Sequence, residues 1–217
     1  MQFFLDSIDI HEIEKYNNYG IIAGITTNPS LIAKAKTDFK GIIAEICKIV
    51  EGSVSVEVAA NDFEYMVKEG DELTKIADNI AVKIPMTWDG IRACKYFANK
   101  GIKVNMTLCF SANQALLAAK AGAEFISPFI GRLEDIGEDG IGLVADIRTI
   151  YDNYNLKTKI LAASIRNPEH VVEAAVCGAD IATMPGNIMS ELVSHDLTSK
   201  GLQKFNADWS KSGLKIL

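Results

Sequence analysis

The feature that most restricts the fold of this chain is an eightfold alternation between short apolar runs and longer stretches with helical periodicity. Strands that alternate with helices pair in parallel, and eight such units favour a closed barrel over an open sheet. We expect the strands at residues 3–5, 24–26, 54–58, 81–85, 103–108, 125–129, 160–163 and 181–184. The sequence therefore predicts an α/β fold, a single-domain (β/α)8 TIM barrel over residues 1–217 with an extra C-terminal helix at about 197–211.

Composition restricts the partners of such a barrel. The chain has 217 residues and a formal net charge of -6, with no basic block and no run that interleaves arginine with aromatic residues. Nucleic acid and membrane are therefore not expected as partners, whereas a small anionic substrate needs only a local basic pocket. No G-x-G-x-x-G follows the first apolar run and no G-x-x-x-x-G-K-[ST] occurs, so the nucleotide-binding signatures of an open sheet are missing.

Cysteine and histidine spacing bears on cofactors and on the compartment. The four cysteines form no C-x-x-C pair, and the three histidines have no metal-ligand spacing. We therefore expect no metal site and no cofactor. Free thiols fit a reducing cytosol, and the N-terminus has no basic region followed by an apolar one, so we expect a cytoplasmic protein without a signal peptide.

A single lysine interrupts the apolar run at 81–85, which Pro85 closes. Burying the Lys83 side chain is costly, because leaving water disfavours its charge. One interpretation is structural, with the amino group reaching water or a carboxylate at the strand end. The other is functional, with a lysine that is partly neutral and can attack a carbonyl group, as Schiff-base lysines do.

The neighbouring strands decide between these interpretations. Side chains alternate between the two faces of a strand, and when the branched residues face the helices the polar ones face into the barrel. In the seventh strand this pattern places residues 160, 162, 164 and 166 on one face. The polar residues lie toward the C-terminal ends of their strands, where such barrels have their catalytic rim. The residues expected to converge there are Asp6, Asn28, Glu57, Lys83, Asn105, Thr107, Ser127 and Ser164.

A lysine and two carboxylates without a metal set indicate covalent carbonyl chemistry. Lys83 would form a Schiff base, and Glu57 and Asp6 would move protons. Hydroxyl and amide groups could bind substrate hydroxyls, namely Asn28, Asn105, Ser127 and Ser164. Arg132 and Arg166 are candidates for a phosphate clamp. Two alternatives stay open, since Arg132 can pair with the neighbouring Glu134 or Asp135, and Arg166 can be a surface residue before a helix.

Several motifs then match a known family in order along essentially the whole chain. They are Asp6 and the segments 26–30 (Thr-Thr-Asn-Pro-Ser), 82–85 (Val-Lys-Ile-Pro), 105–111 (Asn-Met-Thr-Leu-Cys-Phe-Ser), 127–132 (Ser-Pro-Phe-Ile-Gly-Arg) and 163–166 (Ala-Ser-Ile-Arg). Together they resemble transaldolase, in the small subfamily that also contains fructose-6-phosphate aldolase. One departure is Ser7, which follows Asp6 where threonine or alanine is common.

The resemblance implies a class I transaldolase of the non-oxidative pentose phosphate pathway. A dihydroxyacetone unit would pass from fructose 6-phosphate or sedoheptulose 7-phosphate to an aldose phosphate. Lys83 would capture the ketose carbonyl, Asp6 would take the C4 hydroxyl proton, and Glu57 with Thr107 would hold a catalytic water. The bound three-carbon unit would be held by Asn28 and Asn105 with Ser127 close by, and the phosphate by Arg132, Ser164 and Arg166.

Two positions bear on the type of reaction. Members that act as aldolases resemble this chain but have glutamine at position 57 and tyrosine at position 129, where this chain has Glu57 and Phe129. A phenylalanine cannot hand a proton to the enamine, so transfer is expected over release of free dihydroxyacetone. The small subfamily also forms pentamer rings paired into decamers, so we expect a homo-oligomer. Leu202, Phe205 and Trp209 of the last helix could contact a neighbouring subunit or could pack on the chain's own barrel.

Three alternatives remain open from the sequence. The first is a fructose-6-phosphate aldolase that releases free dihydroxyacetone. The second is a barrel that binds a sugar phosphate without catalysis, in which Lys83 only pairs with Glu57. The third is another lysine aldolase on the same barrel, such as one that uses deoxyribose phosphate.

Overall fold

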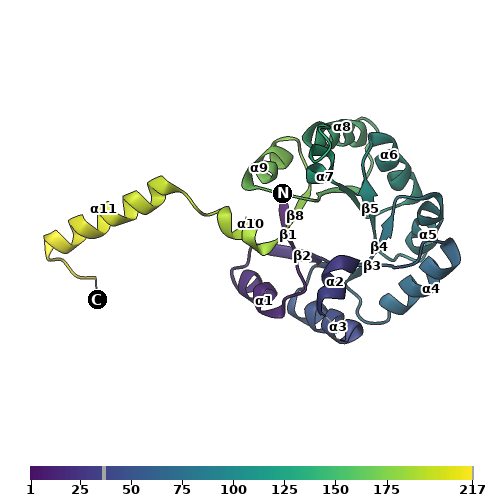
Figure 1. Cartoon of the computed structure of the whole chain (residues 1–217), viewed down its shortest axis with the longest axis horizontal. Helices are drawn as coiled ribbons and strands as arrows, with labels where there is room; N and C mark the ends of the chain where they lie inside the picture. Colours follow the sequence, from purple (N-terminus) through teal and green to yellow (C-terminus); the bar gives the residue numbers. More distant parts are fainter. Residues whose placement is uncertain (36–37, 217) are drawn as a thin grey trace.

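Eight parallel strands close into a barrel in the computed structural model, which describes residues 1–35 and 38–216 (Figure 1). Each strand pairs with the next one along the chain, and β8 pairs with β1. The strands are β1 Gln2–Asp6, β2 Ile22–Thr26, β3 Ser53–Glu57, β4 Ile80–Pro85, β5 Val104–Cys109, β6 Phe125–Pro128, β7 Lys159–Ala162 and β8 Ile181–Met184. The predicted TIM barrel is confirmed.

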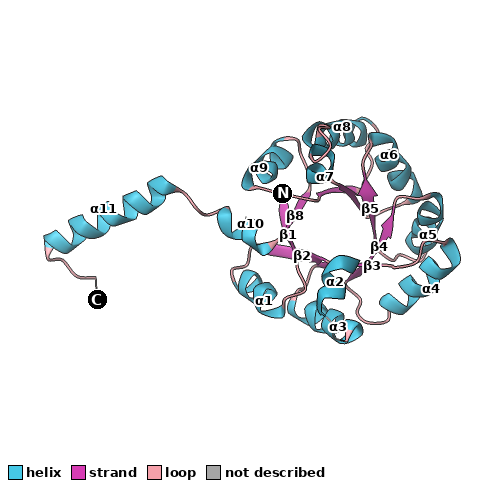
Figure 2. Ribbon diagram, viewed as in Figure 1, coloured by secondary structure: helices cyan, strands magenta, loops and turns pink. Residues whose placement is uncertain are grey.

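All the helices except the last surround this barrel (Figure 2). The helices are α1 Ile10–Asn18, α2 Pro29–Ala35, α3 Phe39–Ile49, α4 Phe63–Leu73, α5 Trp88–Asn99, α6 Ala112–Ala121, α7 Ile130–Glu134, α8 Gly140–Asn153, α9 Pro168–Val176, α10 Gly186–Glu191 and α11 Asp196–Ser212. Side chains that accept hydrogen bonds from free backbone N–H groups start many of them. Examples are Asp9 before α1, Asp62 before α4, Thr87 before α5 and Ser111 before α6.

The alternation of side chains produces two separate apolar cores. The larger core lies between strands and helices and takes the branched residues of the strands, such as Val54, Val56 and Ile84. The smaller core fills the barrel interior and consists of Phe4, Ala81, Phe125, Leu161, Ala163 and Ile181. Because residues two apart share a face, this interior core lies directly beneath the polar residues at the strand ends. The core therefore closes the bottom of the catalytic rim.

The expected facing of the seventh strand was wrong. Ile160 and Ala162 belong to the outer core, whereas Leu161 and Ala163 belong to the interior core. Ser164 nevertheless reaches the rim, because its φ angle of 58° interrupts the two-residue alternation. A left-handed backbone at a non-glycine residue is costly, so the surrounding structure must hold it.

Short helices occupy some of the connections. The connection after β6 contains α7, and the connection after β8 contains α10. The segment after β2 forms the separate helix α2 before α3 begins. These helices are five to seven residues long, which is too short for a clear apolar periodicity in the sequence. The two short helices α7 and α2 stand beside the catalytic rim.

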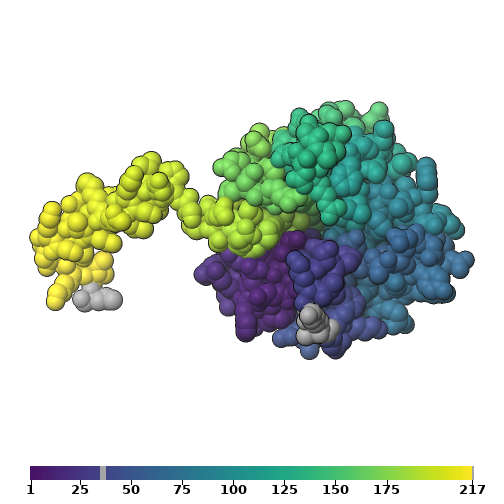
Figure 3. Space-filling model, viewed as in Figure 1, coloured from purple at the N-terminus to yellow at the C-terminus, as the bar shows by residue number. Residues whose placement is uncertain are grey.

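The last helix confirms the expected C-terminal element at about 197–211 but does not pack on its own barrel. Figures 1 and 3 show α11 extended away from the barrel, and none of its residues is buried. Leu202, Phe205 and Trp209 are 56%, 67% and 46% exposed. These three positions recur at helical spacing and form one apolar stripe, here named the α11 stripe.

Within the described residues, no helix combines the length and the apolar character that crossing a membrane requires.

Candidate active site

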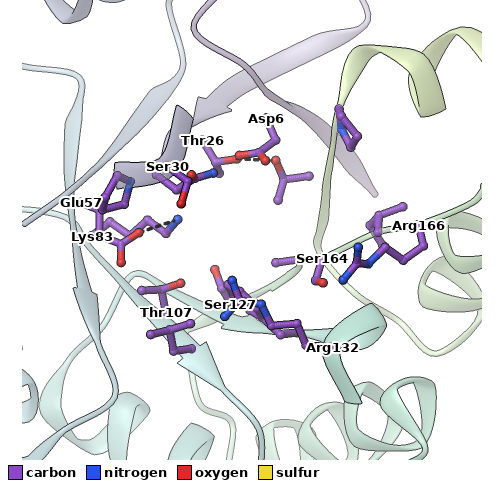
Figure 4. A pocket seen from close by; sticks show the side chains of 18 residues that line it. Asp6, Thr26, Ser30, Glu57, Lys83, Thr107, Ser127, Arg132, Ser164 and Arg166 are labelled. Atoms are coloured by element: carbon purple, nitrogen blue, oxygen red, sulfur yellow. Dashed lines mark hydrogen bonds and ion pairs between the residues drawn. The ribbon is translucent and has the colours of Figure 1, made fainter. Parts of the chain in front are cut away.

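A cavity of about 500 Å³ opens at the C-terminal ends of the strands (Figure 4). It is lined by ten of the eleven residues proposed from the sequence, namely Asp6, Asn28, Glu57, Lys83, Thr107, Ser127, Phe129, Arg132, Ser164 and Arg166. They come from β1, β3, β4, β5, β6 and the connections after β2, β6 and β7. The chain thus gathers residues more than 150 positions apart into one pocket.

Lys83 and Glu57 form a pair on one wall of this cavity. The register of β3 and β4 places the two residues side by side, and Nζ of Lys83 lies 3.0 Å from Oε2 of Glu57. The Lys83 side chain is only 7% exposed. Nζ also donates a hydrogen bond to the backbone carbonyl of Thr27, at 2.9 Å. The amino group is therefore held rigidly, with a carboxylate in reach to accept its proton.

Asp6 lies at the end of β1 and is held by Thr26, which in turn contacts Thr183. Oγ1 of Thr26 donates a hydrogen bond of 2.7 Å to Oδ1 of Asp6, and the same hydroxyl lies 2.7 Å from Oγ1 of Thr183. Burial raises the pKa of Asp6, while the hydrogen bond from Thr26, the charge of Lys83 and a hydrogen bond with Asn28 partly offset that increase. A carboxylate with a raised pKa is a stronger base, which suits general base catalysis.

Thr107 presents a buried hydroxyl at the rim. Its Oγ1 atom is buried, and it has no hydrogen-bond partner among the residues that the structure describes. An unpaired buried polar atom is unusual and calls for an explanation. Because Thr107 also lines the cavity, its hydroxyl is available to a bound molecule.

Asn105 is the one proposed residue that does not line the cavity. It is fully buried. Its Nδ2 group donates to Oγ of Ser55 at 3.1 Å, and its Oδ1 atom accepts from Oγ of Ser127 at 2.7 Å. The structure therefore places Asn105 beneath the rim, where it orients the hydroxyl of Ser127.

Two arginines line the opposite side of the cavity. Figure 4 shows Arg132 and Arg166 with Ser164, across from Lys83 and Glu57. The guanidinium of Arg132 lies over the ring of Phe129, 4.9 Å from its centroid. In the described residues Arg132 forms no ion pair with either acidic neighbour. It is Arg166 that pairs with Asp135, at 2.8 Å between Nη2 and Oδ2.

Gly131 allows the two arginine-bearing segments to approach each other. Its N–H group donates to the carbonyl of Ser164 at 3.0 Å. A Cβ atom at this position would lie 2.4 Å from that carbonyl oxygen and 2.5 Å from Cγ of Arg166. Any larger residue would force the segments apart.

Sequence reasoning missed three polar residues that line the cavity: Thr26, Ser30 and Thr183. Thr26 and Ser30 belong to the motif that was proposed for Asn28 alone. Thr183 follows Ile181 by two positions and so shares its inward face. Applying the alternation rule to the eighth strand would have identified it.

Amine and carboxyl groups thus face two guanidinium groups across one cavity. Such a site can hold a molecule with a carbonyl at one end and an anionic group at the other. No cluster of three or more His, Cys, Asp or Glu side chains suited to a metal ion was found in residues 1–35 and 38–216.

Comparison with known proteins agrees with this geometry. A family model described as "Transaldolase/Fructose-6-phosphate aldolase" matches residues 3–216. The chain is 58% identical over 216 residues to proteins named "Probable transaldolase" from Chelativorans sp. (strain BNC1) and Brucella anthropi. It is also 58% identical over 218 residues to one with the same name from Parvibaculum lavamentivorans. Each alignment covers 100% of both chains. The chain therefore belongs to the transaldolase/fructose-6-phosphate aldolase family.

Proposed function

We propose that the protein is a class I transaldolase, which transfers a dihydroxyacetone unit from a ketose phosphate to an aldose phosphate. The donor is fructose 6-phosphate or sedoheptulose 7-phosphate, and the reaction belongs to the non-oxidative pentose phosphate pathway. The observation that carries this proposal is the buried Lys83 amine, 3.0 Å from the Glu57 carboxylate and across the cavity from Arg132 and Arg166. The family supports the reaction type.

The first step is formation of a Schiff base at Lys83. Its ammonium gives a proton to Glu57, and the free amine attacks C2 of the ketose to form a carbinolamine. The C2 hydroxyl then leaves as water and a C=N bond forms. The buried hydroxyl of Thr107, which has no partner among the described residues, would hold together with Glu57 the water that relays these protons.

The second step breaks the carbon–carbon bond. Asp6 takes the proton from the C4 hydroxyl, the C3–C4 bond breaks, and the electron pair moves into the iminium to give an enamine. The aldose phosphate leaves with C4 as its aldehyde carbon. An incoming aldose phosphate is attacked at its aldehyde carbon by the enamine, and Asp6 returns the proton. Hydrolysis of the new Schiff base releases the product.

The remaining residues would bind the sugar. Asn28 and Ser127 line the same cavity as Lys83 and would bind hydroxyls of the three-carbon unit. Asn105 would act through Ser127, because its Oδ1 atom accepts the hydrogen bond that the Ser127 hydroxyl donates. Arg132, Ser164 and Arg166 would bind the phosphate, because guanidinium groups form strong paired hydrogen bonds with phosphate oxygens.

Phe129 is the observation that favours transfer over cleavage. Its ring lines the cavity and has no proton to give to the enamine. The enamine would therefore wait for an aldehyde acceptor. The second candidate function is a fructose-6-phosphate aldolase, which would release free dihydroxyacetone when no acceptor is present.

Reduction with borohydride tests the Schiff base. The protein is mixed with fructose 6-phosphate, reduced, and analysed by intact mass and peptide mapping. We expect a three-carbon adduct on Lys83 and none in Lys83→Ala. As a control, Lys103→Ala changes a lysine just before the N-terminal end of β5, away from the cavity, and should keep the adduct. A well-folded protein without any adduct at saturating donor would overturn the mechanism and leave a barrel that only binds sugar phosphate. Product analysis with and without an acceptor then separates transferase from aldolase.

The protein is also expected to act as a homo-oligomer, a pentamer or a decamer, in the cytoplasm. The α11 stripe supports association, because large apolar side chains on a projecting helix lose contact with water when a neighbouring subunit covers them.

A further inference from the structure

A buried histidine stands directly behind the arginine side of the cavity, and the proposed chemistry does not use it. His170 is 4% exposed and belongs to the first turn of α9. Its backbone N–H group donates to the side chain of Asn167, which caps the helix, at 2.8 Å. The cap therefore fixes the backbone of His170 and, with it, the position from which the imidazole ring projects.

Both ring nitrogens of His170 have partners. Nδ1 accepts a hydrogen bond of 3.3 Å from the backbone N–H of Arg166. Nε2 lies 2.8 Å from Oε2 of Glu134. Since Nδ1 is an acceptor, the neutral ring carries its hydrogen on Nε2 and donates it to Glu134. The ring thus joins the connection after β7 to α7.

These two segments carry the two arginines of the cavity. Arg132 belongs to α7, and Arg166 to the connection. The segments are also joined by backbone hydrogen bonds from Ile130 and Gly131 and by the exposed ion pair between Arg166 and Asp135. The His170 ring adds a buried side-chain bridge between them. The segments also have a strained element, since Ser164 has a φ angle of 58°. Strain of this kind persists only where neighbouring contacts hold the backbone.

We propose that His170 is a positioning residue for the anionic group of the substrate. By holding the Arg166 backbone against α7, it keeps both guanidinium groups at the spacing that one phosphate requires. Holding a binding group in its bound arrangement raises affinity, because less ordering remains to be done on binding. The inference deepens the proposed function, since it concerns the phosphate subsite of the same cavity.

Two substitutions separate the two contacts of the ring. His170→Asn places an amide oxygen close to the position of Nδ1 and keeps an acceptor for Arg166. His170→Gln places an amide nitrogen close to the position of Nε2 and keeps a donor for Glu134 but loses the acceptor for Arg166. The probe is glucitol 6-phosphate, which has the phosphate but no carbonyl, so its binding does not depend on the Schiff base.

Calorimetry on the full-length protein should show weaker binding of glucitol 6-phosphate to His170→Gln, by about 3- to 10-fold, as for one lost hydrogen bond. His170→Asn should bind closer to the wild type. In transfer assays, KM for fructose 6-phosphate should rise while kcat changes less than about twofold.

Val171→Ala is the control, since it alters a buried neighbour on α9 that contacts neither arginine segment by hydrogen bond. It should lower Tm without weakening binding.

A double-mutant cycle distinguishes positioning from general stability. If His170 acts through Arg166, His170→Gln should cost nothing further in an Arg166→Ala background. An equal loss in both backgrounds would overturn the proposal, and so would unchanged affinity in His170→Gln. Should His170→Gln not fold, Glu134→Ala at the half-exposed end of the bridge is tested in the same cycle with the same expectations. Borohydride trapping reports separately on Lys83, so a failure of the mechanism is distinguishable from a failure of this inference.

Discussion

Glu57 and Lys83 are register partners on adjacent parallel strands, and their charged groups meet at 3.0 Å with little access to water. In a parallel sheet, residues in register point to the same face, so the pairing follows directly from the alternation of the two strands. The carboxylate stabilises the lysine as an ion pair in the resting protein. It is also the nearest base for the proton that the amine must lose.

Glu57→Ala should therefore affect both stability and catalysis. Removing one partner of a buried ion pair costs about 3 kcal/mol of unfolding free energy. The rate of Schiff-base formation should fall by about 100-fold or more, as for a lost general base. Glu57→Gln keeps a hydrogen-bond acceptor for Nζ and should lose less of both. Rapid-quench borohydride trapping measures the rate, and a Schiff base that forms as fast in Glu57→Ala as in the wild type would contradict the assignment.

Asp6→Asn should separate bond cleavage from Schiff-base formation. The amide keeps the size of the side chain but cannot accept the C4 hydroxyl proton. Imine formation should persist while cleavage slows by about 100-fold or more. Borohydride should then trap the intact six-carbon sugar phosphate on Lys83 in place of the three-carbon unit. A three-carbon adduct that accumulates at the wild-type rate would remove Asp6 from this role.

Because the pKa of Asp6 is raised, the effect of Asp6→Asn on thermal stability should depend on pH. Burial favours the protonated form in the folded state, so its contribution to stability is full below the ordinary aspartate pKa of about 3.9 and is lost as the pH rises through the folded value. Asp6→Asn does not titrate. It should therefore have a higher Tm than the wild type at pH 8, and the difference should shrink toward pH 4.5. A difference in Tm that grows as the pH falls would mean that folding lowers the pKa of Asp6 and does not raise it.

The barrel could be predicted from the sequence because eight strands repeat one simple pattern. The same alternation predicted that Glu57, Lys83 and Thr107 face the cavity. It failed at the seventh strand, where Ser164 adopts a left-handed backbone. No local pattern marks a serine in that conformation, since it is imposed by packing against α7. The sequence also placed Asn105 among the residues that line the cavity, whereas its side chain is fully buried and bonded to Ser55 and Ser127.

The partners of the arginines were also beyond sequence reasoning. Proximity along the chain left open a pair between Arg132 and either Glu134 or Asp135. In the folded chain Arg166, 31 positions away, reaches Asp135 instead. A long side chain at the end of a helix or strand can pair with any of several partners at similar energy. Which ion pair forms here depends on the close approach of two segments at Gly131, which only the tertiary structure defines.

Asp135→Asn should strengthen binding of the phosphorylated donor. The carboxylate competes with phosphate for the guanidinium of Arg166, and both side chains of this pair are more than half exposed. An exposed pair is worth about 0.2–1 kcal/mol, so its loss should lower KM for fructose 6-phosphate by up to about fivefold. Asp208→Asn is a matched control, because it breaks another pair in which both side chains are more than half exposed, with Lys204. An increase in KM for Asp135→Asn would mean that Asp135 orients Arg166 for phosphate and does not compete with it.

Phe129→Tyr should shift the reaction from transfer toward cleavage. The new hydroxyl would enter the cavity and could give a proton to the enamine. Release of free dihydroxyacetone without an acceptor should rise at least about tenfold. Phe110 offers a control, since its ring packs edge-on against Phe129, 5.7 Å between centroids, and is 37% exposed. Equal effects of Phe110→Tyr and Phe129→Tyr would indicate a general loosening of the site.

The α11 stripe should determine the oligomeric state. Replacing both Phe205 and Trp209 by aspartate would put two charges into any interface that covers the stripe. Each large apolar side chain contributes about 1.5–3 kcal/mol when fully buried, so the double variant should dissociate at micromolar concentration. Light scattering coupled to size exclusion measures the mass. Lys204→Glu changes the opposite, polar side of α11 and should leave the mass unchanged.

Because none of the α11 residues is buried on the chain's own barrel, the dissociated barrel should keep its Tm within a few degrees. A wild-type chain that is already monomeric would leave the stripe without a subunit to contact and would contradict the oligomer.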